Sequence, residues 1–316
     1  VNPEYIEISF SNECNFKCGY CHPKASSRYW NEIKQHGPYS MSTKHRQDID
    51  WFKVYKKEEE NPYVKAWWEW WPEVSKTLNI LRITGGEPLM HKSLWDLFDK
   101  LEADPKPNIQ IEVNSNMGVK PKLVEKLTET VLRLKEKNCI KSFKLYTSID
   151  NWGPKAEYIR TGLDLKVWEK NLDYFLSNTP FSVIFMITFN IFSVTGFDSL
   201  LEKILEWRYK YNGIVEPQVR WQKVQFDTPH LKEPHMYDMN ILPKDQFVPY
   251  MTKHLQFIGD NVDDSDRHKF SLLEYERFRR VVDYMRTTEY DDNKLATGRK
   301  TFYNWFTQYD KRSNSN

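Results

Sequence analysis

The sequence predicts an α/β fold, namely an incomplete (β/α)6 barrel of the TIM type with a C-terminal helical extension. Short apolar, β-branched segments alternate with segments of helical periodicity, which is typical of parallel strands joined by right-handed crossovers. Six such strand-like segments occur, fewer than the eight strands that close a complete barrel. The strands are predicted for residues 5–10, 79–84, 108–114, 142–148, 181–189 and 217–226.

Helical segments separate and follow these strands. In residues 122–137, for example, Leu123, Leu127 and Leu134 recur at the spacing that places apolar side chains on one helix face. A tryptophan-rich helix predicted for 63–78 contains Pro72, which we expect to kink or divide it. Further core helices are predicted for 93–103, 165–177 and 197–211, and extension helices for about 244–258, 267–287 and 294–310.

The same alternation indicates the domain organisation. We expect a core at residues 1–226, with an aromatic-rich insert at about 23–78, and a helical extension at 227–316 that covers the open side of the barrel. The tryptophans of the insert are expected to be packing residues rather than a ligand platform. His230 and His235 lie in a predicted loop without an acidic pattern, so we expect neither a ligand nor a base there.

Composition excludes some function classes. The chain of 316 residues has 46 Lys and Arg against 44 Asp and Glu. This near balance gives no strongly basic field, so nucleic acid is not an expected partner. No apolar run approaches the roughly 20 residues that span a bilayer, so no membrane partner is expected either. We expect a cytoplasmic protein, because its clustered thiols need a reducing compartment.

Three of the four cysteines, Cys14, Cys18 and Cys21, form a C-x3-C-x2-C loop just after the first predicted strand. Thiolates are ligands for iron–sulfur clusters and for zinc, and three of them leave one coordination position open for chemistry. A zinc knuckle completed by His22 is the alternative, but four ligands within so few residues would be cramped. A disulfide framework is less expected still, since four cysteines could form at most two cross-links, which would stabilise little of a chain this long.

Residues Gly85-Gly86-Glu87-Pro88 follow the second predicted strand. Paired glycines allow a sharp turn that exposes backbone polar groups, and carbonyls together with the Glu87 carboxylate suit an ammonium group. The two motifs together resemble the signature of the radical S-adenosylmethionine (SAM) enzymes. The resemblance implies that the three thiolates hold a [4Fe–4S] cluster whose fourth iron is chelated by SAM. It also implies that the Gly-Gly-Glu-Pro turn binds the SAM amino group and that Tyr20 lies against adenine.

The resemblance covers about residues 4–226 and implies further cofactor contacts. Asn116 lies in a segment similar to the Thr-Asn-Gly end of the third strand, although Met117 precedes the glycine. Ser148 and Asp150 resemble the Ser-x-Asp strand end that contacts the SAM ribose. Arg160 resembles the arginine placed near the SAM carboxylate in peptide-modifying members. Asn190 is a candidate adenosine contact with an ordinary strand-end cap as the alternative, and Cys139 is expected to be a buried structural residue.

Strand alternation predicts one charged layer. Arg82, Glu112 and Lys144 lie on the same strand faces as Thr84, Asn114 and Ser148. If these faces point inward, a plus–minus–plus layer crosses the barrel.

The resemblance implies reductive cleavage of SAM, with an electron from flavodoxin or ferredoxin, and hydrogen abstraction from a substrate. A peptide or protein substrate, as in the SPASM/twitch branch, is the first expectation, although the extension lacks cysteines for an auxiliary cluster. A nucleoside or other small molecule is the alternative within enzymes. A zinc-stabilised binding module, with the tryptophan-rich insert as its recognition surface, is the alternative of a different class.

Overall fold

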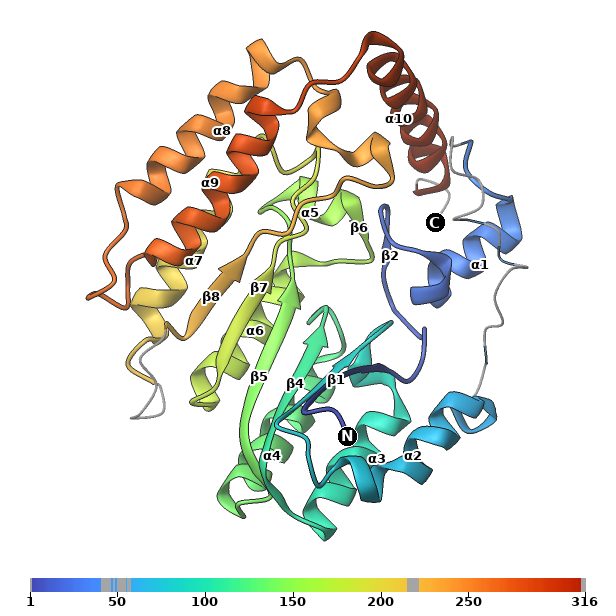
Figure 1. Ribbon diagram of the computed structural model, residues 1–316, viewed down its shortest axis with the longest axis vertical. Coiled ribbons are helices and arrows are strands. Elements are labelled where there is room, and N and C mark those ends of the chain that lie inside the picture. The colour runs from blue at the N-terminus through green and yellow to red at the C-terminus, as the bar shows by residue number, and fades with distance from the viewer. Residues whose placement is uncertain are drawn as a thin grey trace.

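A single parallel sheet organises the computed structural model, which describes residues 2–40, 47, 49, 55, 58–214 and 222–313. Its six strands lie in chain order and every neighbouring pair is parallel, as the predicted partial barrel requires (Figure 1). The strands are β1 (Tyr5–Ser9), β3 (Ile80–Thr84), β4 (Lys106–Ser115), β5 (Ile140–Ser148), β7 (Ser182–Met186) and β8 (Val224–Asp227). The predicted sixth strand was placed too early: β8 begins at Val224, and residues 215–221 lie outside the described part.

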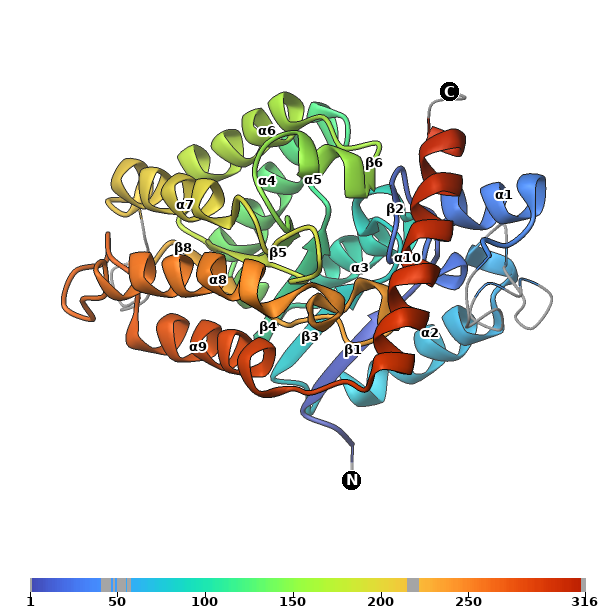
Figure 2. The same cartoon turned by 90° about the horizontal axis from the view of Figure 1, so that it is seen from above.

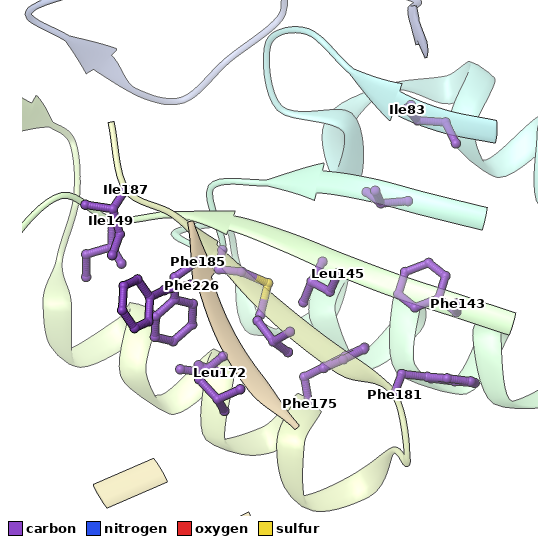
Figure 3. Close-up of a cluster of buried hydrophobic side chains, with 14 of the residues drawn as sticks. Ile83, Phe143, Leu145, Ile149, Leu172, Phe175, Phe181, Phe185, Ile187 and Phe226 are labelled. Atoms are coloured by element: carbon purple, nitrogen blue, oxygen red, sulfur yellow. The ribbon is translucent and has the colours of Figure 1, made fainter. Parts of the chain in front are cut away.

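Alternation along the strands separates an apolar face from a polar one. Leu81, Ile83, Val113 and Leu145 are fully buried because helices cover this face of β3, β4 and β5 and exclude water. Figure 3 shows part of this core, in which Phe143, Leu145, Phe175 and Phe181 lie between the sheet and a helix. Four helices form the cover, α3 (Lys92–Ala103), α4 (Pro121–Glu136), α6 (Leu165–Asn178) and α7 (Phe197–Tyr211), and Figure 2 shows them along one side of the sheet.

The opposite, concave face carries the predicted charged layer. Arg82, Glu112 and Lys144 are register partners across β3, β4 and β5. Glu112 is almost fully buried and accepts a hydrogen bond from Gln110 at 2.6 Å. Arg82 donates through Nε to Asn114 Oδ1 at 2.9 Å. The concave face is therefore polar, with charges of both signs and hydrogen-bonded partners for Arg82 and Glu112.

The aromatic insert contains two helices, α1 (Ser27–His36) and α2 (Pro62–Val74). Sequence periodicity did not predict α1, which begins where Ser26 Oγ accepts from Tyr29 N at 3.1 Å. Pro72 does not divide α2, because it lies close to the end of the helix. Trp67 and Trp71 are buried in the core, as expected, whereas Trp70 is 41% exposed. Trp51 and Phe52 of the insert lie outside the described residues.

The extension adds α8 (Lys244–Gly259), α9 (Leu272–Thr287) and α10 (Asp292–Ser313). Figure 2 shows α8 and α9 continuing the ring of helices past β8. The prediction started α9 too early, since Ser271 and Glu274 form a capping box at its N-terminus. The fully buried Arg208 of α7 joins this layer to the core through Glu274 at 2.6 Å. Across the described ranges, every helix is too short or too polar to cross a lipid bilayer.

A buried lysine links two helix ends to the sixth strand and gives a stability prediction. The Lys223 ammonium donates to the carbonyls of Leu176 (2.7 Å), Ile214 (2.6 Å) and Thr179. Burial lowers the pKa of Lys223 to about 8, so the group is charged at pH 7. We expect Lys223→Met to lower the free energy of unfolding by about 2–4 kcal/mol at pH 7, because two buried carbonyls and one partly buried carbonyl lose their donor.

Denaturant unfolding followed by circular dichroism measures this change. Lys253→Met is the control, because the Lys253 side chain is 74% exposed and such surface changes stay within about 0.5 kcal/mol. Equal stability of the two variants would contradict the assigned role of Lys223.

Candidate functional site

The carboxyl ends of the parallel strands surround one open cavity of about 250 Å³. The three clustered cysteines contribute to its wall together with groups from β3, β4, β5 and the segment that follows α5 (Pro154–Ile159). This is the end of the sheet where parallel α/β folds place ligands. Of the predicted site residues, the cavity is lined by Cys14, Cys18, Tyr20, Cys21, Gly85, Gly86, Asn116, Ser148 and Arg160.

The cysteine loop is held from both sides by hydrogen bonds. Strand β2 (Lys17–Cys18) pairs antiparallel with β6 (Arg160–Thr161), so that Cys18 lies opposite Arg160. On the other side of the loop, Ser26 Oγ, at the start of α1, donates to Phe16 O at 2.8 Å. The loop therefore has a fixed shape before any ligand binds, which lowers the ordering cost of ligand binding.

The environment of the three thiols suits a cluster of several metal ions. Burial raises the pKa of all three thiols, that of Cys21 to about 12, so metal binding must release protons. Within the described ranges, no three His, Cys, Asp or Glu side chains converge as ligands of a single ion do. His22 Nδ1 instead accepts from Lys24 N at 3.0 Å. Among the described residues, His22 and the three thiols are therefore not arranged as the four ligands of a zinc knuckle would be.

The diglycine turn packs directly against the cysteine loop. Gly85 and Gly86 have φ values of 80° and 47°, in the left-handed region that favours glycine. A Cβ atom on Gly86 would lie 2.2 Å from the carbonyl oxygen of Glu13, and Glu87 N donates to that same oxygen at 2.7 Å. The two sequence motifs therefore meet at one edge of the sheet, and both glycines line the cavity.

Glu87 and Pro88 lie behind the cavity wall rather than in it. Pro88 is buried and opens a short 3₁₀ turn. The fully buried Glu87 carboxylate accepts from Ser115 Oγ (2.8 Å), Asn116 N (2.6 Å) and Leu89 N (3.1 Å). Burial raises the pKa of Glu87 to about 7, against the effect of these three donors. The carboxylate thus ties the diglycine turn to the end of β4, and its contact with an ammonium group stays a prediction.

Asn116 joins the end of β4 to the cysteine loop. Its Nδ2 donates to Asn15 Oδ1 at 2.8 Å, and Asn15 Nδ2 donates to Gly118 O at 2.8 Å. The inserted Met117 has a φ of 55°, and a Cβ on Gly118 would lie 2.2 Å from the ring of Phe16. The departure from the expected Thr-Asn-Gly pattern therefore still brings a glycine against the loop.

A buried polar network lies beside Cys18. Asp150 and Arg160 form an ion pair with an N···O distance of 2.9 Å, and Tyr20 Oη donates to Asp150 Oδ2 at 2.5 Å. Ser148, two residues before Asp150, lines the cavity. Tyr20 and Arg160 are thus fixed at the cavity wall by Asp150, which is itself almost fully buried.

Two predicted residues lie away from the cavity. Asn190 is fully buried, and its side chain donates to Thr188 O (2.8 Å) and accepts from Phe192 N (2.9 Å), as a turn cap does. Its contact with adenosine stays a prediction. Cys139 precedes β5 at the opposite end of the sheet and is buried in the hydrophobic core.

The sequence reasoning missed the contribution of α10, which lies beside β2 and β6 in Figures 1 and 2. Tyr309 Oη donates to Lys17 O at 3.2 Å and to Tyr158 O at 3.1 Å. A Cβ on Gly19 would lie 2.7 Å from the ring of Trp305. No local pattern could have shown this, because Tyr309 lies 292 positions from Lys17 and 151 positions from Tyr158.

We therefore expect Tyr309→Phe to loosen the cysteine loop. The variant removes the hydroxyl that contacts the carbonyl oxygens of Lys17 and Tyr158 in this buried region, at a cost of about 1–3 kcal/mol. Reconstituted protein should then lose iron to a chelator faster than the unmodified chain does. Tyr303→Phe is the matched control, since Tyr303 lies on the same helix and is 68% exposed. Equal iron loss from both variants would refute this role of α10.

Comparisons with known proteins show which proteins this chain is similar to. The chain is 22% identical over 281 residues to the GTP 3',8-cyclase of Sulfurimonas denitrificans, an alignment that covers 86% of this chain and 72% of that protein. It is 28% identical over 155 residues to the GTP 3',8-cyclase of a Sulfurovum species, covering 49% of this chain and 36% of that protein. The chain therefore spans only part of the length of each.

The fold resembles that of Streptococcus suis SuiB, solved with bound S-adenosylmethionine, with a TM-score of 0.50 and 15% identity over 82% of this chain and 47% of that one. A family model of the Radical SAM superfamily matches residues 8–204, more than half of the chain. That segment contains the cysteine loop, the diglycine turn, the end of β1 and the whole of β3, β4, β5 and β7. The chain thus belongs to the radical SAM superfamily, an enzyme family whose cofactors are a [4Fe–4S] cluster and SAM.

Proposed function

We propose that Cys14, Cys18 and Cys21 bind the cluster and that the turn at Gly85 and Gly86 binds the SAM amino group. The observation that supports this assignment most strongly is that the three thiols and the diglycine turn line one cavity. Held there, the reduced cluster and SAM would supply the chemistry for reductive cleavage of the C5′–S bond of SAM and for hydrogen abstraction from the substrate.

The residues of this chain hold the reactants and exclude water. The thiols must give up their protons on metal binding, which their burial makes costly without the metal. The glycines let backbone carbonyls approach the ammonium group without steric hindrance. Tyr20 and Ser148 line the same cavity, where they would contact the adenine and the ribose. A reduced flavodoxin or ferredoxin is the proposed electron donor, and the cytoplasm the proposed location.

We propose a polar substrate that reaches the concave face of the sheet. That face carries Glu7, Arg82, Glu112, Lys144 and Asp227, charges of both signs within the barrel. Such a surface suits a peptide or protein segment, whose backbone and side chains offer donors, acceptors and both charges. The resemblance of Arg160 to the arginine of peptide-modifying members supports the same choice.

A nucleotide is the second candidate. Two curated relatives are GTP 3',8-cyclases, and the first of them aligns over most of this chain. Arg82 and Lys144 on the concave face could bind phosphate groups. The acidic Glu112 and Asp227 on the same face weaken this choice by like-charge repulsion.

Anaerobic reconstitution with iron and sulfide, followed by reduction with dithionite in the presence of SAM, tests the proposal. We expect bound iron with acid-labile sulfide, and formation of 5′-deoxyadenosine. Protein that binds zinc alone, or that binds iron without cleaving SAM, would contradict the assignment. GTP added to the same reaction separates the substrate candidates, because a substrate raises 5′-deoxyadenosine formation above the rate without it.

A further inference from the structure

The guanidinium of Arg160 is held in one orientation with one amino group directed at a cluster-binding sulfur. Its Nε and Nη2 donate to Asp150 Oδ2 and Oδ1, each at 2.9 Å, which is the bidentate fork of a strong arginine–carboxylate pair. Its remaining amino group, Nη1, lies 3.6 Å from Cys18 Sγ, within hydrogen-bonding distance of a sulfur acceptor. The Arg160 side chain is 5% exposed, so water screens this contact little.

The surroundings prevent the fork from turning away. Asp150 Oδ1 also accepts from Thr188 N at 2.9 Å, and Asp150 Oδ2 from Tyr20 Oη at 2.5 Å, so the carboxylate is fixed from two further directions. The backbone of Arg160 is fixed as well, because it is the direct β-bridge partner of Cys18. Gly19 N donates to Ile159 O at 2.8 Å and keeps the two strands in register. The hydrogen bonds of Asp150 and the backbone pairing with Cys18 therefore fix the direction of Arg160 Nη1 toward Cys18 Sγ.

We propose that Arg160 is a positioning residue that donates a hydrogen bond to the Cys18 thiolate and thereby raises the reduction potential of the cluster. This inference rests on the proposed binding of the cluster by Cys18. Hydrogen bonds to the cysteine sulfurs and nearby charges are among the factors that set cluster potentials. A donor and a positive charge at Cys18 stabilise the more negative, reduced state in a site that excludes water.

The two roles of Arg160 are separated by what they predict. The fork to Asp150 uses Nε–H and one N–H of Nη2, so a SAM carboxylate and Cys18 Sγ would draw on the remaining donors of Nη1 and Nη2. A role through Cys18 predicts an effect on the cluster when SAM is absent. A role in carboxylate binding predicts an effect on SAM affinity alone.

Redox titration of the reconstituted chain without SAM, followed by electron paramagnetic resonance, provides the test. We expect Arg160→Met to shift the midpoint potential to more negative values, because it removes both the donor and the charge. Arg160→Lys, which keeps the charge but loses the fork, should give a smaller shift in the same direction. Arg28→Met is the matched control, since Arg28 Nη1 reaches the same loop at Asn15 O (2.7 Å) rather than at a sulfur. Its potential should equal that of the unmodified chain.

The outcomes separate this inference from the proposed function. If the unmodified chain binds no iron and sulfide, both fail. If Arg160→Met holds the cluster at an unchanged potential while its Kd for SAM rises, the proposed function stands and this inference is refuted. If Arg160→Met does not retain a cluster, the midpoint potential of Arg160→Lys is measured instead. An unchanged potential in Arg160→Lys also refutes the inference.

Discussion

Replacing Cys18 with alanine is expected to lower the rate of SAM cleavage more than about 100-fold. Loss of a residue that only hydrogen-bonds a metal ligand already lowers metal affinity or activity about 10- to 100-fold. Cys18 lies between the other two thiols in sequence and is the one in β2, directly opposite Arg160. Its loss leaves two thiolates for a cluster that needs three from the protein. Iron and acid-labile sulfide per chain, and 5′-deoxyadenosine formed after reduction, measure the effect.

Cys139→Ala is the matched control for this variant. Cys139 is also a free thiol, but it is buried at the amino end of β5 and its Sγ donates to Lys137 O at 3.8 Å. We expect this variant to bind the same amount of iron and to cleave SAM at the unmodified rate. Undiminished SAM cleavage by Cys18→Ala, or a comparable loss in Cys139→Ala, would contradict the assignment of the cluster to the C-x3-C-x2-C loop.

Gly86→Ala is expected to separate the diglycine turn from the cysteine loop and so to abolish SAM binding. The added Cβ would meet the backbone of Glu13 at 2.2 Å, and backbone cannot move aside as the end of a side chain can. The left-handed φ of 47° adds strain for a residue with a side chain. Together these effects should cost about 3 kcal/mol or more of unfolding free energy. Isothermal titration with SAM and thermal unfolding report the two effects separately.

Gly153→Ala controls for backbone strain alone. Gly153 also has a positive φ, of 92°, but a Cβ there meets nothing within 4 Å. We expect this variant to lose about 1 kcal/mol of stability and to bind SAM normally. Normal SAM binding by Gly86→Ala would show that SAM binding does not need contact between the diglycine turn and the cysteine loop. Loss of SAM binding in both Gly86→Ala and Gly153→Ala would mean that backbone strain causes the effect.

Much of the fold follows from local patterns that the sequence displays directly. Alternating apolar residues predicted β3, β4 and β5, and helical spacing predicted α7 with both bounds correct. The prediction failed where local patterns are weak. Helix α1 carries a polar sequence whose few apolar side chains form no long stripe, and β2 and β6 consist of two residues each. Such short strands exist only because their partner is present, so no periodicity can reveal them.

The local sequence alone predicts the chemistry of the site, because the spacing of Cys14, Cys18 and Cys21 and the Gly-Gly turn are local features that few functions need. The partners of the other polar residues become visible in the folded chain. It engages Arg160 with Asp150 and directs Nη1 at Cys18, and it ties Glu87 to β4. It also brings Tyr309 under the cysteine loop. The physical reason is that hydrogen-bond partners of buried groups are chosen by which segments the fold brings within about 3 Å, and sequence distance does not encode that proximity.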